Sequence, residues 1–134
     1  GWAMSAELIT AALLNVAGVT NLVGDRRALA VLPQNCTMPA LVYSTISTTP
    51  IFTMNALSGP QLLESRIQVT ALAITPAAVE QILAAVMAAM NLKSGAYAGK
   101  NVARIIRNIK APITRDNEAN VWYGSQDFMA LWYE

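Results

Sequence analysis

The sequence has no histidine and only one cysteine, Cys36. The missing histidine removes the usual general base, the usual partner of a serine or cysteine nucleophile, and the commonest transition-metal ligand. A single cysteine excludes an intrachain disulfide framework and fits a reducing compartment. Cys36 lies between Pro33 and Pro39 with no activating base nearby in the sequence, so we expect an inert thiol in a loop. These absences argue against an enzyme, and we expect no catalytic residue, no metal and no cofactor.

Charge is also scarce. Charged residues make up 13% of the 134 residues, whereas an average soluble protein has about 25%. The nine lysines and arginines are scattered and the net charge is +1, so a lone subunit is not expected to bind nucleic acid. The longest apolar run, Ile82 to Met90, is far shorter than the roughly 20 residues of a membrane span, and we expect no membrane partner.

The hydrophobic fraction is nevertheless 54%. Either an alanine-rich helix surface accounts for this excess, or other subunits cover part of the surface. The length fits one domain. Residues 1–3 precede Met4 and read as a cloning remnant, so the predicted domain spans residues 4–134.

The chain is organised around the stretch from Glu64 to Met90. Alternation of polar and apolar residues from Arg66 to Ala71 predicts a strand with Ile67 and Val69 on its covered face. Thr75 and Pro76 then predict the N-cap and first position of a helix. Its apolar residues recur at helical spacing, at Val79, Ile82, Leu83, Val86 and Met90. Because each element has one apolar side, we expect the helix to fold back over its own strand.

Before this stretch the sequence predicts a helix, a corner and a strand. Ser5 is the expected cap of the first helix, and Gly18 is its expected end. The predicted buried stripe consists of Ile9, Ala12, Leu13 and Val16. Residues 19–24 read as a single turn, residues 25–27 as a solvated charged corner, residues 28–32 as a short extended piece, residues 33–39 as a loop and residues 40–47 as a strand.

Residues 48–63 are punctuated by Pro50, Gly59 and Pro60, yet they carry large apolar side chains. These are Ile51, Phe52, Met54 and Leu57. Two interpretations remain open: a loop packed on its own core, or the arm of a long hairpin that grips a neighbouring subunit. We favour the arm, because exposed apolar side chains on a free tip would promote aggregation.

The C-terminal part predicts two further strands. Residues 102–110 place Arg104 and either Ile106 or Asn108 on one face, with Ile105, Arg107 and Ile109 on the other, so neither face is cleanly apolar. Residues 112–120 form a polar turn, and the aromatic-rich strand 121–133 is long enough to bend at Gly124. The predicted fold is α+β: a two-layer sandwich with two main helices on one face of a mostly antiparallel sheet of at least four strands, and a long hairpin arm. The other sheet face is expected to meet solvent, a lumen or another subunit.

Few residues suggest chemistry. Asp116 and Glu118 are the only acidic residues close together in sequence, and they lie on the predicted solvated turn. There is no glycine-rich phosphate loop, no CxxC pair and no nucleophile elbow. If their strands were neighbours, Arg66, Arg104, Arg107 and Lys110 would form a modest basic face that a ring of copies would multiply.

Several short segments occur in a recognisable order. They are residues 19–26; Leu32-Pro33-Gln34 followed by residues 39–43; Arg66 to Val69 entering a helix; and residues 127–133. In this order, over nearly the whole of residues 4–134, they resemble the tail completion family of long-tailed bacteriophages, also described as tail-to-head joining or tail terminator-like proteins.

The resemblance implies a non-enzymatic structural virion protein. It would form a hexameric ring at the head-proximal end of the tail tube, end tube polymerisation and join the tail to the head connector. Its partners would be other copies of itself, the tail tube protein, the head–tail connector protein and DNA passing transiently through the ring. Its location would be the head–tail junction of the virion, after assembly in the host cytoplasm. In that setting Ile51, Phe52, Met54 and Leu57 are the expected subunit interface, and Arg104, Arg107 and Lys110 the expected channel lining.

A second hypothesis is a small-ligand or regulatory binding module with the same two-layer architecture. It requires a pocket with convergent polar groups. The oligomeric state of the isolated chain distinguishes the two hypotheses, because a binding module stays monomeric or dimeric at high concentration and forms no rings.

Overall fold

The computed structural model of the chain describes residues 5–31, 37–51 and 61–134. Its helices are α1 (Ser5–Leu14), α2 (Ala17–Val23) and α3 (Pro76–Met90). Its strands are β1 (Arg27–Leu29), β2 (Ala40–Ile51), β3 (Leu62–Ala73), β4 (Gly95–Tyr97), β5 (Lys100–Lys110), β6 (Thr114–Asp116) and β7 (Val121–Tyr133). Cys36 lies outside the described residues.

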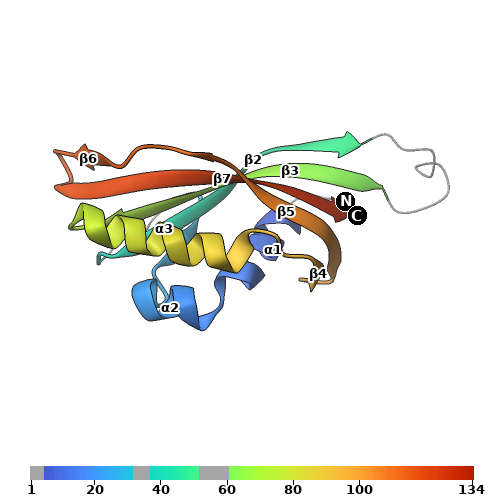
Figure 1. Cartoon of the computed structure of the whole chain (residues 1–134), viewed down its shortest axis with the longest axis horizontal. Coiled ribbons are helices and arrows are strands. Elements are labelled where there is room, and N and C mark those ends of the chain that lie inside the picture. Colours follow the sequence, from blue (N-terminus) through green and yellow to red (C-terminus); the bar gives the residue numbers. More distant parts are fainter. Residues whose placement is uncertain (1–4, 32–36, 52–60) are drawn as a thin grey trace.

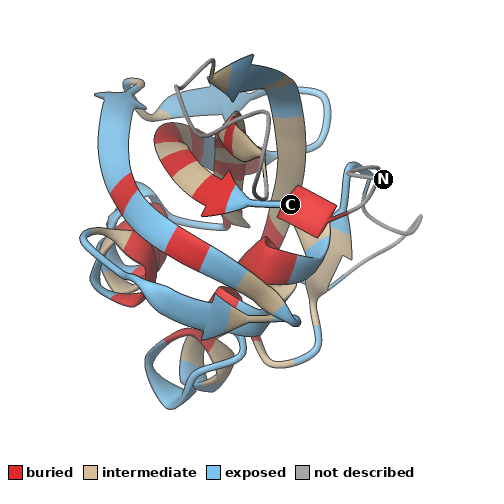
Figure 2. Cartoon of the chain, turned by 90° about the vertical axis from the view of Figure 1, so that its right-hand side faces the viewer, coloured by how far each residue is buried: buried red, intermediate tan, exposed pale blue. Residues whose placement is uncertain are grey.

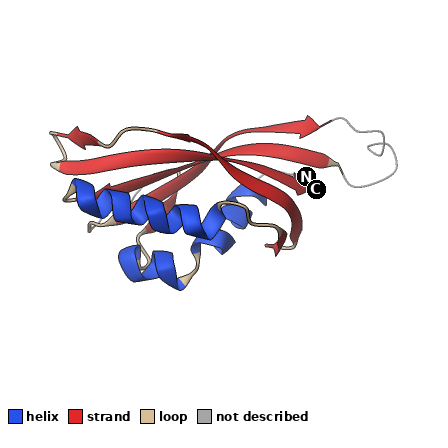
Figure 3. Ribbon diagram, viewed as in Figure 1, coloured by secondary structure: helices blue, strands red, loops and turns tan. Residues whose placement is uncertain are grey.

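The seven strands of the described residues belong to one sheet, in the order β1-β2-β3-β7-β5-β4, with β6 paired to β7. In the described part β1 and β2 run parallel, and the other neighbouring strands run antiparallel. The helices lie together on one side of the sheet (Figures 1 and 3). The predicted α+β class and two-layer arrangement are therefore confirmed, with three helices in the described ranges where two main ones were predicted.

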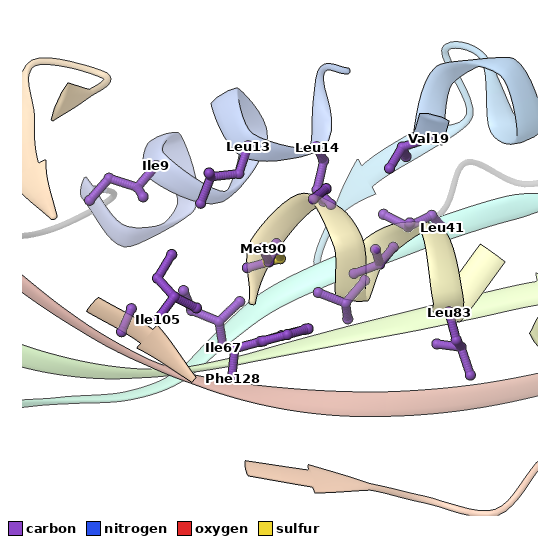
Figure 4. Packing of buried hydrophobic residues seen from close by; sticks show 14 of the residues in the cluster. Ile9, Leu13, Leu14, Val19, Leu41, Ile67, Leu83, Met90, Ile105 and Phe128 are labelled. Atoms are coloured by element: carbon purple, nitrogen blue, oxygen red, sulfur yellow. The ribbon is translucent and has the colours of Figure 1, made fainter. Parts of the chain in front are cut away.

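The β3–α3 unit is built as the sequence predicts. Every second residue of β3 is buried, including Ile67 and Val69. The Thr75 hydroxyl accepts a hydrogen bond from the Ala78 N–H at 3.2 Å, and Pro76 occupies the first turn of α3. The predicted apolar stripe of α3 is buried: Val79, Ile82, Leu83, Val86 and Met90. The strand's inner face and the helix stripe form a common core (Figure 4).

The N-terminal segment differs from its prediction. The first helix ends at Leu14, because Val16 has extended backbone angles (φ −127°, ψ 154°), and a second helix then begins at Ala17. The axes of α1 and α2 make an angle of 86°. Gly18 thus lies inside α2 instead of ending α1.

The buried face of α1 is also rotated from the predicted stripe. Ile9 and Leu13 are buried as predicted, whereas Ala12 and Val16 are exposed. Ala6, Thr10 and Leu14 are buried instead, and the Thr10 hydroxyl donates to the Ala6 carbonyl at 2.8 Å. Figure 4 shows Ile9, Leu13 and Leu14 pointing from α1 towards Met90 of α3 and the sheet.

At Gly124 α3 approaches the sheet closely. A Cβ atom added there would lie 3.1 Å from Leu83 Cδ1 and 3.2 Å from both Val79 Cγ1 and Ile113 Cγ1. Two residues along β7, the buried Gln126 side chain donates from Nε2 to the Leu83 carbonyl at 2.7 Å. The glycine expected to bend the last strand therefore makes room for the helix.

Two register shifts explain the mixed pattern of β5. Between Val102 and Arg104 the pairing with β7 slips by one residue, so Val102 and Ile105 both face the core. A second shift falls between Arg107 and Lys110. Such bulges reset the alternation of side chains and bend a strand. The banded burial along the strands is visible in Figure 2.

Candidate functional site

Within residues 5–31, 37–51 and 61–134, no helix covers the face of the sheet opposite α1, α2 and α3 (Figure 3). We call this the helix-free face. Its central columns are the partly buried alternate residues of β3 and their β7 partners. From one end to the other the cross-strand pairs are Leu62 with Tyr133, Glu64 with Leu131, Arg66 with Met129, Gln68 with Asp127, Thr70 with Ser125, and Leu72 with Tyr123.

The middle of the helix-free face is polar and internally paired. Arg66 donates from Nε to Asp127 Oδ2 at 2.7 Å, and the Asp127 residue is only 4% exposed. The hydroxyls of Thr70 and Ser125 lie 2.8 Å apart and share a hydrogen bond. Since a carboxylate this buried requires a partner, the Arg66 guanidinium explains why Asp127 is tolerated here.

One end of the helix-free face is apolar. Leu62, Met129 and Leu131 are partly buried, while Ile106 of β5 and Tyr133 are 39% and 40% exposed. The register brings them together, because Leu131 pairs with Glu64 and Arg104, and Met129 pairs with Arg66 and Ile106. We call these five residues the apolar end. Three of the five are partly buried, and Glu64, Arg66 and Arg104 lie among them in the register, so the apolar end is a small apolar patch with charged neighbours. An apolar centre with a polar rim is typical of a surface that meets another protein.

The hairpin predicted to carry the arm is present at this same end. β2 and β3 pair in antiparallel register up to Ile51 and Leu62, and Leu62 belongs to the apolar end. The paired strands extend beyond the helical layer (Figure 1). Of the predicted interface residues, Ile51 is partly buried, and Phe52, Met54 and Leu57 lie outside the described residues.

The three predicted channel residues lie on one exposed strand but on two faces. Arg104 pairs with Leu131 and lies on the helix-free face, as does Arg66, with β7 between their strands. Arg107 and Lys110 take the opposite register, and Lys110 forms an ion pair with Glu80 of α3. The predicted division between Arg104 with Ile106 and Ile105 with Arg107 matches the observed register.

The charged corner at residues 25–27 is more structured than predicted. Arg26 donates from Nε to the Pro39 carbonyl at 2.7 Å. Arg27 donates from Nε to the Gly24 carbonyl at 2.9 Å and from Nη1 to the Leu14 carbonyl at 3.2 Å. Both side chains are partly buried, so they are not merely a solvated corner. A pair of arginines just after a glycine that ends a helix is a recognisable signal for such carbonyl contacts.

Arg27 also borders a small cleft that sequence reasoning missed. The cleft has a volume of about 270 Å³ and is lined by Ala11, Leu14, Asn15, Arg27 and Tyr43. It lies between the C-terminal end of α1 and the strands β1 and β2. The residues come from segments far apart in the sequence, which is why no local pattern indicates it.

Residues 5–31, 37–51 and 61–134 contain no group of three or more cysteine, aspartate or glutamate residues arranged to hold a metal ion. No single helix there is long and apolar enough to span a membrane, although α1 and α2 taken together pass that test as a pair bent by 86°.

Comparison with known proteins agrees with this geometry. The chain has the same fold as one in the structure titled "Virion of native gene transfer agent (GTA) particle", with a TM-score of 0.71, 14% identity and complete coverage of both chains. No curated protein matches the sequence. The family model described as "Tail completion protein gp17" matches residues 7–133. The chain therefore belongs to the tail completion protein gp17 family of structural tail proteins.

Proposed function

We propose that this protein caps the head-proximal end of a phage tail tube as a hexameric ring, ends tube polymerisation and joins the tail to the head connector. In this role it is a non-enzymatic virion subunit at the head–tail junction, assembled in the host cytoplasm. Its partners are other copies of itself, the tail tube protein and the head–tail connector protein. DNA passes through the ring, and no cofactor takes part.

The observation that carries the proposal is the apolar end of the helix-free face in a chain of the tail completion family. Burying apolar area stabilises a contact by about 25 cal/mol per Å². A partner that covers Ile106, Leu131 and Tyr133 therefore gains binding free energy. A contact between this surface and a different surface of the next copy would be heterologous, and heterologous contacts that close generate rings.

The hairpin supplies a second contact in this proposal. Ile51 pairs with Leu62 of the apolar end, so one neighbouring subunit can cover both the end of the hairpin and the apolar end at once. In such a ring Arg107, which lies on the face of β5 opposite the apolar end, contributes positive charge at the opening, repeated in every copy, where DNA phosphates pass.

The alternative binding module is less well supported. Small-molecule pockets generally measure about 300–1,000 Å³, and the cleft beside Arg27 measures about 270 Å³. It fits one side chain better than a metabolite, so we do not propose this function.

Particle assembly without the protein tests the proposal. A producing strain that lacks the gene should release heads and tails that remain separate, with tubes of irregular or excessive length in electron micrographs. Supplying the wild-type chain in trans should restore joined particles. Joined particles with tails of normal length in the absence of the protein would contradict the proposal.

A paired substitution tests the apolar end itself. Leu131→Asn changes a residue of the apolar end, whereas Leu92→Asn makes the same change at a site that is 73% exposed and follows α3. Only Leu131→Asn should block complementation, and its thermal unfolding should be measured to show that it folds. Equal activity of the two variants would exclude the apolar end as an assembly surface.

A further inference from the structure

We propose that the cleft beside Arg27 binds the Glu118 carboxylate of a second copy of this chain. The inference rests on the proposed ring, and it assigns one head-to-tail contact within it. It uses surfaces separate from the apolar end and from the hairpin arm.

The cleft offers polar groups that the described part of its own subunit leaves without a hydrogen bond. Arg27 has five N–H donors, and Gly24 and Leu14 accept two bonds, from Nε and Nη1. Its Nη2, the Tyr43 hydroxyl and the Asn15 amide have no hydrogen-bond partner among residues 5–31, 37–51 and 61–134. All three side chains line the cleft above an apolar floor of Ala11 and Leu14.

This combination of groups fits a carboxylate. A guanidinium held by two carbonyls is already oriented, and its remaining donors match the oxygens of a carboxylate. A tyrosine hydroxyl and an asparagine NH₂ add neutral donors. The volume of about 270 Å³ accommodates one acidic side chain.

Two exposed apolar residues near the cleft-lining residues in sequence favour a protein as the source of the carboxylate. Leu8 lies one turn before Ala11 on α1 and is 55% exposed, and Val16 follows Asn15 and is 43% exposed. A protein partner can bury such side chains around a charged contact, which a free metabolite cannot.

The β6–β7 turn of the same chain carries a suitable acidic side chain. Residues 114–120 are all exposed, and the turn lies at one end of the sheet (Figure 1). Asp116 Oδ1 accepts hydrogen bonds from the Glu118 N–H at 3.0 Å and the Ala119 N–H at 3.2 Å. Arg115 also bonds the Asn120 side chain across the turn. The turn is thus ordered before binding, which lowers the entropic cost of the contact. Glu118 is exposed, and its carboxylate has no hydrogen-bond or ion-pair partner in the described part of the chain.

Cleft and turn are different surfaces with opposite charge, so the contact is heterologous and each copy can both give and receive it. An ion pair of this kind is screened by salt. Self-association should therefore weaken as the salt concentration rises.

Sedimentation velocity of the full chain tests this contact. Glu118→Gln removes the charge without changing shape, and Asn15→Asp places a carboxylate in the cleft without removing an internal hydrogen bond. Because a hydrogen bond to a charged group contributes about 1.5–3 kcal/mol, each change should weaken self-association about 10- to 100-fold. The controls Glu134→Gln and Asn21→Asp make the same changes at exposed positions outside the cleft and the turn and should have little effect.

A mixture of the two defective variants gives the decisive measurement. The Glu118→Gln copy keeps an intact cleft and the Asn15→Asp copy keeps an intact turn, so together they should form heterodimers that do not grow further. A mixture that stays monomeric, a wild-type chain that shows no self-association at any concentration, or variants that associate like wild type would each overturn the inference. If the Glu118→Gln variant still completes tails normally, this contact is wrong while the proposed function stands.

Discussion

Gly124 provides the most direct test of how the helical layer sits on the sheet. Gly124→Ala would place a methyl group 3.1 Å from Leu83 and 3.2 Å from Val79, closer than ordinary carbon contacts. Overpacking of this kind costs about 1–3 kcal/mol. Alanine recovers about 0.5–1 kcal/mol relative to glycine through reduced backbone entropy. The net expectation is a loss of about 0.5–2 kcal/mol in the free energy of unfolding.

Gly18→Ala is the matched control. Gly18 lies within α2, and a Cβ atom added there has no neighbour within 4 Å. With no steric cost, the gain in helix propensity should stabilise the protein by about 0.5–1 kcal/mol. Chemical denaturation of both variants and of the wild type shows whether each substitution lowers or raises the free energy of unfolding. If Gly124→Ala were as stable as wild type or more stable, α3 would not approach β7 as closely as described.

The remaining predictions concern the helix-free face, the arm and the channel. Asp127→Asn should lower stability by about 1–3 kcal/mol, because Arg66 loses its buried charged partner; Glu64→Gln on the same face should change stability far less in the same denaturation assay. The double change Phe52→Ser and Met54→Ser should abolish tail joining in a complementation assay while the thermal midpoint stays near that of wild type; intact joining would exclude the arm as the subunit contact. Replacing Arg104, Arg107 and Lys110 together by glutamine should leave particles joined but slow DNA ejection and reduce infectivity; unchanged ejection would exclude these residues from the channel.

The parts of the fold that were predictable from sequence depend on local signals. Thr75 and Pro76 define the start of α3 by capping chemistry, and the alternation in β3 identifies its buried face without knowledge of its neighbours. The hairpin between β2 and β3 follows from two strand patterns around a punctuated segment. These elements form as predicted because local preference and tertiary packing agree.

The parts that were not predictable depend on contacts between distant residues. The predicted apolar stripe continues to Val16, whereas the helix ends at Leu14. It ends there because α2 turns by 86° and buries Val19 and Val23. The bulge in β5 is visible only once β7 is known to be its partner. Likewise, the need for glycine at position 124 is visible only once the position of α3 is known, because side chains of α3 would contact an added Cβ atom.

The candidate surfaces divide in the same way. Sequence reasoning predicted the arm, three of whose four residues lie outside the described part of the chain, and it predicted the exposed cations of β5; both are local patterns. It missed the apolar end, because Ile106, Leu131 and Tyr133 meet only through the register of β5 and β7. It also missed the cleft, which joins α1 to residues of β1 and β2.

Tube growth in the presence of the purified protein tests the central claim most directly. Tail tube protein from the same phage would be polymerised with and without this chain and imaged by negative-stain electron microscopy. The account predicts that the chain arrests growth and adds a ring of density at one end of each tube. Tubes that continue to lengthen, with unmodified ends at saturating concentrations of the chain, would contradict it.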